Sequence, residues 1–184
     1  PHLQDPSVVT DFPDVRFGLV GVSTDADNVS SATFADEEGG YLAGVAAALK
    51  SDTGVVGFIG GAPIQAIEEF RAGFEAGVTE VDPDATILAT YVNQFGEDVP
   101  GFGAPAIAAE RARALYQRGA DVVFHAAGHS GFGLFDVVVE ESEAAGRHLW
   151  TIGVDNDQWF DVEVDQREHM LTSIIKRGDV AAFE

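Results

Sequence analysis

The sequence contains no cysteine and only two lysines, Lys50 and Lys176, beside eight arginines. Without cysteine, disulfides and thiolate chemistry are excluded within this chain. The sequence also lacks any run of about 18 apolar residues, so we expect no membrane-spanning helix. No signal peptide is recognisable at Pro1.

Positive charge is scarce throughout. The 31 acidic residues stand against 10 basic ones, which gives a formal net charge of −21. Such a chain repels nucleic acid and anionic membranes, so we expect neither as a direct partner. The acidic residues are dispersed rather than gathered in a tail. This pattern fits either an ordinary acidic protein or one adapted to molar salt, which screens self-repulsion; we favour the halophilic interpretation.

What the sequence does contain is a regular alternation of apolar strand-like runs and amphipathic helical segments. Strands separated by single helices predict an α/β fold with parallel pairing and right-handed crossovers. The hydrophobic content of 46% is enough for a real core. We expect strands at 15–22, 55–59, 86–92, 121–125, 149–154 and 170–176, and helices at 36–49, 64–77, 104–118 and 135–145.

The stretch from residue 119 to residue 158 forms one complete unit of this pattern. A buried strand ends at His125, a glycine-containing loop and a helix follow, and a second strand ends at Val154. The polar run from Asp155 to Gln158 comes directly after that strand. In open α/β sheets, ligands bind at the carboxyl ends of the strands, so we place a candidate binding site here.

Motifs of enzyme chemistry are weak in this chain. The glycine-rich segment 54–61 has neither the G-x-G-x-x-G spacing nor a following P-loop lysine. Ser130 lies in Gly-His-Ser-Gly, which lacks the G-x-S-x-G elbow of hydrolases. We therefore predict a protein that is not an enzyme and that uses no cofactor.

Metal binding is also weakly indicated. Asp155 and Asp157 have no histidine or further carboxylate at a useful local spacing. His125 and His129 are four residues apart, but they lie across a strand–loop junction and not on one helix face. We expect no metal site, and we expect His125 either to line the cleft or to bond nearby backbone.

Seven segments carry a resemblance to a known family: 29–34, 38–44, 54–61, 70–77, 119–136, 152–158 and 171–177. In order and content they resemble the basic membrane protein family, the solute-binding proteins of ATP-driven (ABC) importers, of which purine nucleoside receptors are the best-known members. The resemblance implies a type I periplasmic-binding-protein fold with two Rossmann-like lobes and parallel sheets. It also implies that this chain corresponds to the middle of such a protein, truncated at both ends.

The resemblance further implies a division between the lobes. Residues 1–33 would end the first lobe and form a crossover, and residues 34–154 would form the second lobe. Residues 155–184 would contain the return crossover and part of the first lobe, including the strand at 170–176.

Ligand contacts are carried over from the family to three residues. Phe124 would stack on a base, while Asp155 and Lys176 would hold the ribose hydroxyls. Each has an alternative: Phe124 as a core residue, Asp155 as a hinge hydrogen bond or helix cap, and Lys176 as a surface charge. Retaining a lysine where the chain otherwise uses arginine favours a functional role, since a compact ammonium suits a sugar oxygen.

Three further residues complete the expected site. Gly128 would let ligand approach the backbone closely, and His125 would line the cleft. Asp98 falls in a loop that resembles a family motif, but an extra residue precedes it and Gln94 replaces the family serine.

We therefore expect an extracytoplasmic, membrane-anchored lipoprotein that captures a nucleoside, with a purine favoured, and delivers it to an ABC permease. Its contact with the membrane would be a lipid anchor outside this chain. The alternatives are a ligand-sensing effector domain of a regulator, a riboflavin-binding member of the same family and, as a third choice, an enzyme of nucleoside metabolism.

Overall fold

The computed structural model describes residues 6–21, 23–93 and 100–181. It divides into two compact units, one of residues Pro1–Ala35 and Lys176–Glu184 and the other of residues Asp36–Ile175. Each unit is described by itself.

The smaller unit contains two parallel strands that pair with Phe17 opposite Val29. The Asn28 side-chain amide donates to the carbonyl oxygens of Val9, Phe12 and Val15 at 3.0–3.1 Å, and so ties the segment before the first strand to the turn before the second. The elements are α1 (Pro6–Asp11), β1 (Phe17–Val20), β2 (Val29–Ala32) and α6 (Gly178–Ala181).

The strand β1 differs from the buried strand expected at 15–22. It is shorter, half-buried and exposed residues alternate along it, and Val20 is 55% exposed. Among the described residues, β1 pairs only with β2. Its apolar side chains are therefore only partly covered within this unit.

The larger unit is built on a five-stranded sheet in the order β4-β3-β5-β6-β7, in which every neighbouring pair is parallel. This confirms the predicted α/β class. The strands are β3 (Val55–Gly60), β4 (Thr86–Tyr91), β5 (Val122–Ala126), β6 (Trp150–Asp155) and β7 (Met170–Ile175). The helices are α2 (Asp36–Lys50), α3 (Gln65–Val81), α4 (Pro105–Gln117) and α5 (Phe132–Ala145), with the short 3₁₀ turns η1 (Gly128–Gly131), η2 (Gln158–Phe160) and η3 (Arg167–His169).

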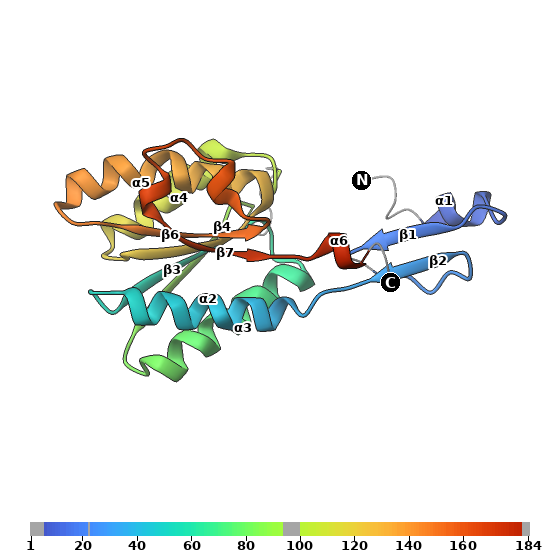
Figure 1. The fold of residues 1–184 in the computed structure, drawn as a ribbon, viewed down its shortest axis with the longest axis horizontal. Helices are drawn as coiled ribbons and strands as arrows, with labels where there is room; N and C mark the ends of the chain where they lie inside the picture. Colours follow the sequence, from blue (N-terminus) through green and yellow to red (C-terminus); the bar gives the residue numbers. More distant parts are fainter. Residues whose placement is uncertain (1–5, 22, 94–99, 182–184) are drawn as a thin grey trace. The chain divides into compact units, whose positions relative to one another are not determined.

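Two helical layers cover the sheet, with α2 and α3 on one face and α4 and α5 on the other (Figure 1). Each layer has its own buried apolar cluster. The α2/α3 side is rich in aromatic rings, which include Phe58, Phe70 and Phe74. The α4/α5 side is aliphatic, with residues such as Leu115 and Leu134. Both faces of the central strands are buried, which explains their continuous apolar runs.

Helices α2 and α3 approach each other closely because glycines face the contact. An added Cβ on Gly44 would collide with the carbonyl oxygen of Phe74, and one on Gly73 would collide with that of Glu37. The same holds for Gly40 and Gly77. The four glycines therefore set the distance between the two helices.

The division between the units falls later than the expected boundary between residues 154 and 155. Strand β7 pairs with β6 from Thr151–Met170 to Asp155–Ile175, and Ile174 packs against the α2/α3 core. These hydrogen bonds and apolar contacts place residues 155–175 in the larger unit, so the chain leaves it between Ile175 and Lys176.

Candidate functional site

The strand order defines a switch point between β3 and β5. The chain runs from β3 outward to β4 and then crosses back to β5 on the other side of β3. The loops that leave β3 and β5 therefore diverge, and crevices at this position are the usual ligand sites of open α/β sheets. The backbone N–H of Gly61 donates to the carbonyl oxygen of Ala126 at 2.9 Å and ties the two strand ends together.

Phe102 lies at this switch point. An added Cβ on Gly61 would collide with the Phe102 ring, and one on Gly128 would lie 3.5 Å from it. Gly128 also has a φ of +52°, a left-handed conformation that favours glycine. The ring thus rests on two glycine loops while Phe102 remains 40% exposed. An exposed aromatic ring at the carboxyl ends of parallel strands can stack on a flat apolar ligand.

Ser130 fixes the segment that carries Phe102. Its side chain is fully buried, and its Oγ donates to the carbonyl oxygen of Gly101 and accepts from the N–H of Ala104, both at 2.9 Å. Because Ser130 belongs to η1, both hydrogen bonds connect the loop around Phe102 to this turn. The hydroxyl is therefore engaged in holding a loop.

Asp155 ends β6 in an unusual backbone conformation. It has a φ of 72°, and it is the one residue other than glycine with positive φ in the described part of the chain. The N–H of Asn156 donates to the carbonyl oxygen of Val154 at 2.9 Å, which makes Asp155 the centre of a γ-turn. The residue is exposed at the carboxyl edge of the sheet. Asp155 is thus exposed at the edge of the sheet where α/β proteins usually bind their ligands.

His125 lies on β5, the strand next to β6, and it is fully buried, so it does not line an open surface. Its Nε2 lies 2.9 Å from Gln158 Oε1, and its ring packs edge-on against Phe135. Burial lowers the pKa of His125 to about 4, against the opposing effect of the bond to Gln158. Its Nδ1 has no hydrogen-bond partner among the described residues. His125 is therefore a neutral internal side chain at neutral pH.

Phe124 is also fully buried. Its ring contacts those of Phe58, Phe70 and Phe74 at centroid distances of 5.6–5.9 Å. This geometry favours the core alternative over base stacking. The sequence indicates that Phe124 is near a strand end, but it could not show that packing covers this ring and leaves that of Phe102 exposed.

Lys176 lies in the smaller unit, where its ammonium is 5.6 Å from the centroid of the Phe34 ring. This distance is within the range of a cation–π contact. Asp98 falls outside the described residues. The functional roles of Lys176 and Asp98 remain predictions.

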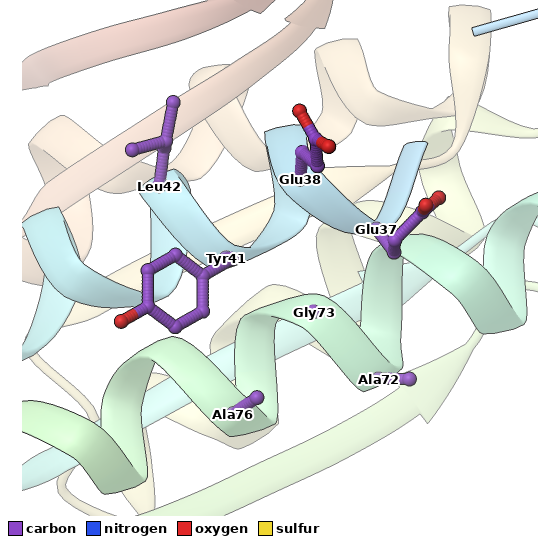
Figure 2. A pocket seen from close by; sticks show the side chains of 7 residues that line it. All are labelled: Glu37, Glu38, Tyr41, Leu42, Ala72, Gly73 and Ala76. Carbon is purple, nitrogen blue, oxygen red and sulfur yellow. The ribbon is translucent and has the colours of Figure 1, made fainter. Parts of the chain in front are cut away.

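A separate hollow of about 600 Å³ lies between α2 and α3 (Figure 2). Tyr41 and Glu37 border it from α2, opposite the small residues Ala72, Gly73 and Ala76 of α3. It lies over the helices and away from the strand ends, so it lacks the geometry of a ligand site in an α/β sheet.

Over the residues that the structure describes, no three histidine, cysteine, aspartate or glutamate side chains gather in a way that would hold a metal ion. In the same residues, no helix combines the length and the apolar character needed to cross a bilayer.

The fold is that of type I periplasmic solute-binding proteins. A solute-binding protein of an ABC transporter system from Aeropyrum pernix matches with a TM-score of 0.80 and 26% identity, over 96% of this chain and 48% of that one. A similar protein from Conexibacter woesei matches with a TM-score of 0.62 and 27% identity, over 89% of this chain and 50% of that one. A transcriptional activator of the comK gene from Bacillus halodurans shares the fold, with a TM-score of 0.73 and 23% identity, over 95% of this chain and 54% of that one.

Residues 5–184 match the model of one family, described as ABC transporter substrate-binding protein PnrA-like (Bmp), and the chain belongs to this family. The expected resemblance is thereby confirmed. A CD4+ T-cell-stimulating antigen of Listeria monocytogenes is 40% identical over 92% of this chain and 47% of its own length. The ABC transporter nucleoside-binding protein BmpA of Lactococcus lactis is 40% identical over 80% of this chain and 41% of its own. The chain spans about half the length of the curated relatives it matches.

The family to which the chain belongs is one of ABC transporter substrate-binding proteins.

Proposed function

We propose that the protein captures a nucleoside outside the cytoplasm and delivers it to an ABC permease. The observation that carries the proposal is the carboxyl edge of the parallel sheet, where an exposed aromatic ring, Phe102, lies at the switch point and an exposed carboxylate, Asp155, ends a strand. A nucleoside needs an apolar face for its base and an acceptor for its sugar hydroxyls. The name of the 40% identical Lactococcus lactis relative supports the same ligand class.

In this proposal Asp155 accepts hydrogen bonds from the ribose, Phe102 stacks on the base, and Gly128 keeps its backbone open to the ligand. Lys176 donates to a sugar oxygen, as the family resemblance implies. Closure of two lobes around the ligand would shift an open–closed equilibrium, and no bond in the ligand would be broken. A purine is favoured, and a lipid anchor would hold the protein at the membrane.

Two variants of the intact protein separate the sugar contact from the base contact. Asp155→Asn should weaken nucleoside binding by about 1.5–3 kcal/mol and leave free-base affinity nearly unchanged, because it removes a charge-assisted acceptor. Phe102→Ala should weaken nucleoside and free base alike, by about 1–3 kcal/mol, because stacking involves only the base.

Leu49→Ala is the matched control, since Leu49 is 73% exposed at the last turn of α2 and should not affect binding. If calorimetry gave equal nucleoside affinity for the wild type and for both site variants, Asp155 and Phe102 would not form the binding site.

A ligand-sensing domain of a regulator is the second candidate, because the Bacillus halodurans transcriptional activator shares the fold. Riboflavin is the second candidate ligand. A full-length reading frame that encodes a helix-turn-helix instead of a lipidated signal segment would favour the regulator.

A further inference from the structure

A row of three positions crosses β5, β6 and β7 near the carboxyl edge of the sheet. Gly153 of β6 stands in register with Ser173 of β7. On the other side Phe124 pairs with Ile152, and this register brings the next residue, His125, beside Gly153. Side chains at adjacent parallel positions point to the same face of the sheet. His125 and Ser173 therefore flank the space that Gly153, having no side chain, leaves open.

The side chain of Gln158 fills this space. An added Cβ on Gly153 would lie 2.5 Å from Gln158 Oε1 and 2.7 Å from Ser173 Oγ, so only glycine admits the amide here. Gln158 is 4% exposed although it follows a polar, exposed turn. The chain thus turns back after the exposed turn, and the side chain of Gln158 packs across β6.

The bonds of Gln158 fix both its orientation and that of its neighbours. Its Oε1 lies 2.8 Å from the backbone N of Val154 and 2.9 Å from His125 Nε2. The Val154 N–H can only donate, so the atom it meets is the amide oxygen, and His125 donates from Nε2 to the same oxygen. The backbone N–H of Gln158 donates to Ser173 Oγ at 3.3 Å. One residue therefore links three strands: its side chain bonds to β5 and β6, and its backbone bonds to β7.

These contacts lie directly beside the turn at Asp155. Val154, whose N–H is held by Gln158, supplies the carbonyl oxygen that closes the γ-turn with the N–H of Asn156. A left-handed conformation at a residue other than glycine persists only where its surroundings over-determine it, and such residues cluster at functional sites. The Gln158 amide is buried and is bonded to Val154, the residue directly before Asp155.

We propose that Gln158, oriented by the hydrogen bond from His125, is a positioning residue that holds Asp155 in its γ-turn and thereby aims the carboxylate at the sugar of the ligand. The proposal rests on the proposed function, in which Asp155 binds the ribose. His125 acts through Gln158 and does not touch ligand.

The test is a double-mutant cycle in the intact protein between Gln158→Met and Asp155→Ala. The probes are adenosine, guanosine and uridine, with the free base of whichever binds most tightly as the second probe. Gln158→Met keeps the length of the side chain and removes its acceptor, so we expect a loss of about tenfold or more in nucleoside affinity and little change for the free base. In the Asp155→Ala background the same substitution should have no further effect.

Gln117→Met, at the exposed end of α4, is the matched control and should bind as the wild type does. His125→Phe is a second route to the same question if Gln158→Met does not fold. It keeps an aromatic ring against Phe135 and removes only the bond to Gln158, and it too should cost nucleoside affinity only while Asp155 is present.

The outcomes separate the two proposals. Unchanged nucleoside affinity in Asp155→Ala would overturn the proposed sugar contact itself. If Asp155→Ala loses affinity for the nucleoside but the Gln158 and His125 variants do not, the positioning role is overturned. It is also overturned if the Gln158 and His125 variants lower the affinity for nucleoside and for free base by equal factors, and do so equally in the Asp155→Ala background. In both cases Gln158 supports only the fold.

Discussion

His125 is a titratable side chain that the fold keeps neutral. Burial lowers its pKa from 6.5 to about 4, and in the unfolded chain the side chain takes up a proton below about 6.5. Between these values the unfolded state binds more protons than the folded state. The contribution of His125 to stability is therefore complete above pH 6.5 and is lost as the pH falls toward 4.

We predict that replacing His125 by glutamine flattens this part of the pH profile. Glutamine can still donate to Gln158 Oε1 but does not titrate. The wild type should lose about 3 kcal/mol more than the variant between pH 7 and pH 4, a figure that follows from the size of the pKa shift. Urea unfolding at a series of pH values measures the difference, and parallel profiles for the two proteins would contradict a buried neutral His125.

At the scale of the elements, local pattern was enough to place the helices and strands of the larger unit. The apolar spacing of α3 and the buried run of β5 lie within single segments, so the sequence shows them directly. What it could not show depends on partners distant in the chain. The pairing of β7 with β6, the exposure of Phe102 instead of Phe124, and the γ-turn at Asp155 all follow from packing between segments.

The close packing of α2 against α3 can be tested by substitution of a glycine at their contact. Gly44→Ala should destabilise the protein by about 1–3 kcal/mol, because the added methyl group would force the helices apart. This loss should exceed the gain in helix propensity, which is about 1 kcal/mol or less. In a domain of this size the melting temperature should fall by several degrees, roughly 2–4 °C per kcal/mol.

Gly178→Ala serves as the control, since an added Cβ there meets nothing within 4 Å. Equal melting temperatures for the Gly44 and Gly178 variants would show that the two helices do not depend on the glycine contact.

At the scale of the whole molecule, the net charge of −21 sets the response to salt. Self-repulsion among dispersed carboxylates destabilises a compact state, and molar salt shortens the Debye length to about 3 Å. We predict that the melting temperature of the intact protein rises by on the order of 5 °C between 0.05 M and 2 M KCl, which corresponds to about 2 kcal/mol. An unchanged melting temperature across this range would contradict adaptation to high salt.

The central claim is that the strand-end site serves to capture a nucleoside without altering it. The most direct measurement is calorimetric titration of the intact protein with adenosine, guanosine, uridine, their free bases, riboflavin and ribose, followed by chromatography of the recovered ligand. The account predicts saturable binding of one nucleoside per protein, tighter than the binding of ribose or of the free base, with the nucleoside recovered unchanged. Binding of riboflavin or ribose with no binding of any nucleoside, or recovery of the nucleoside as base and sugar, would contradict it.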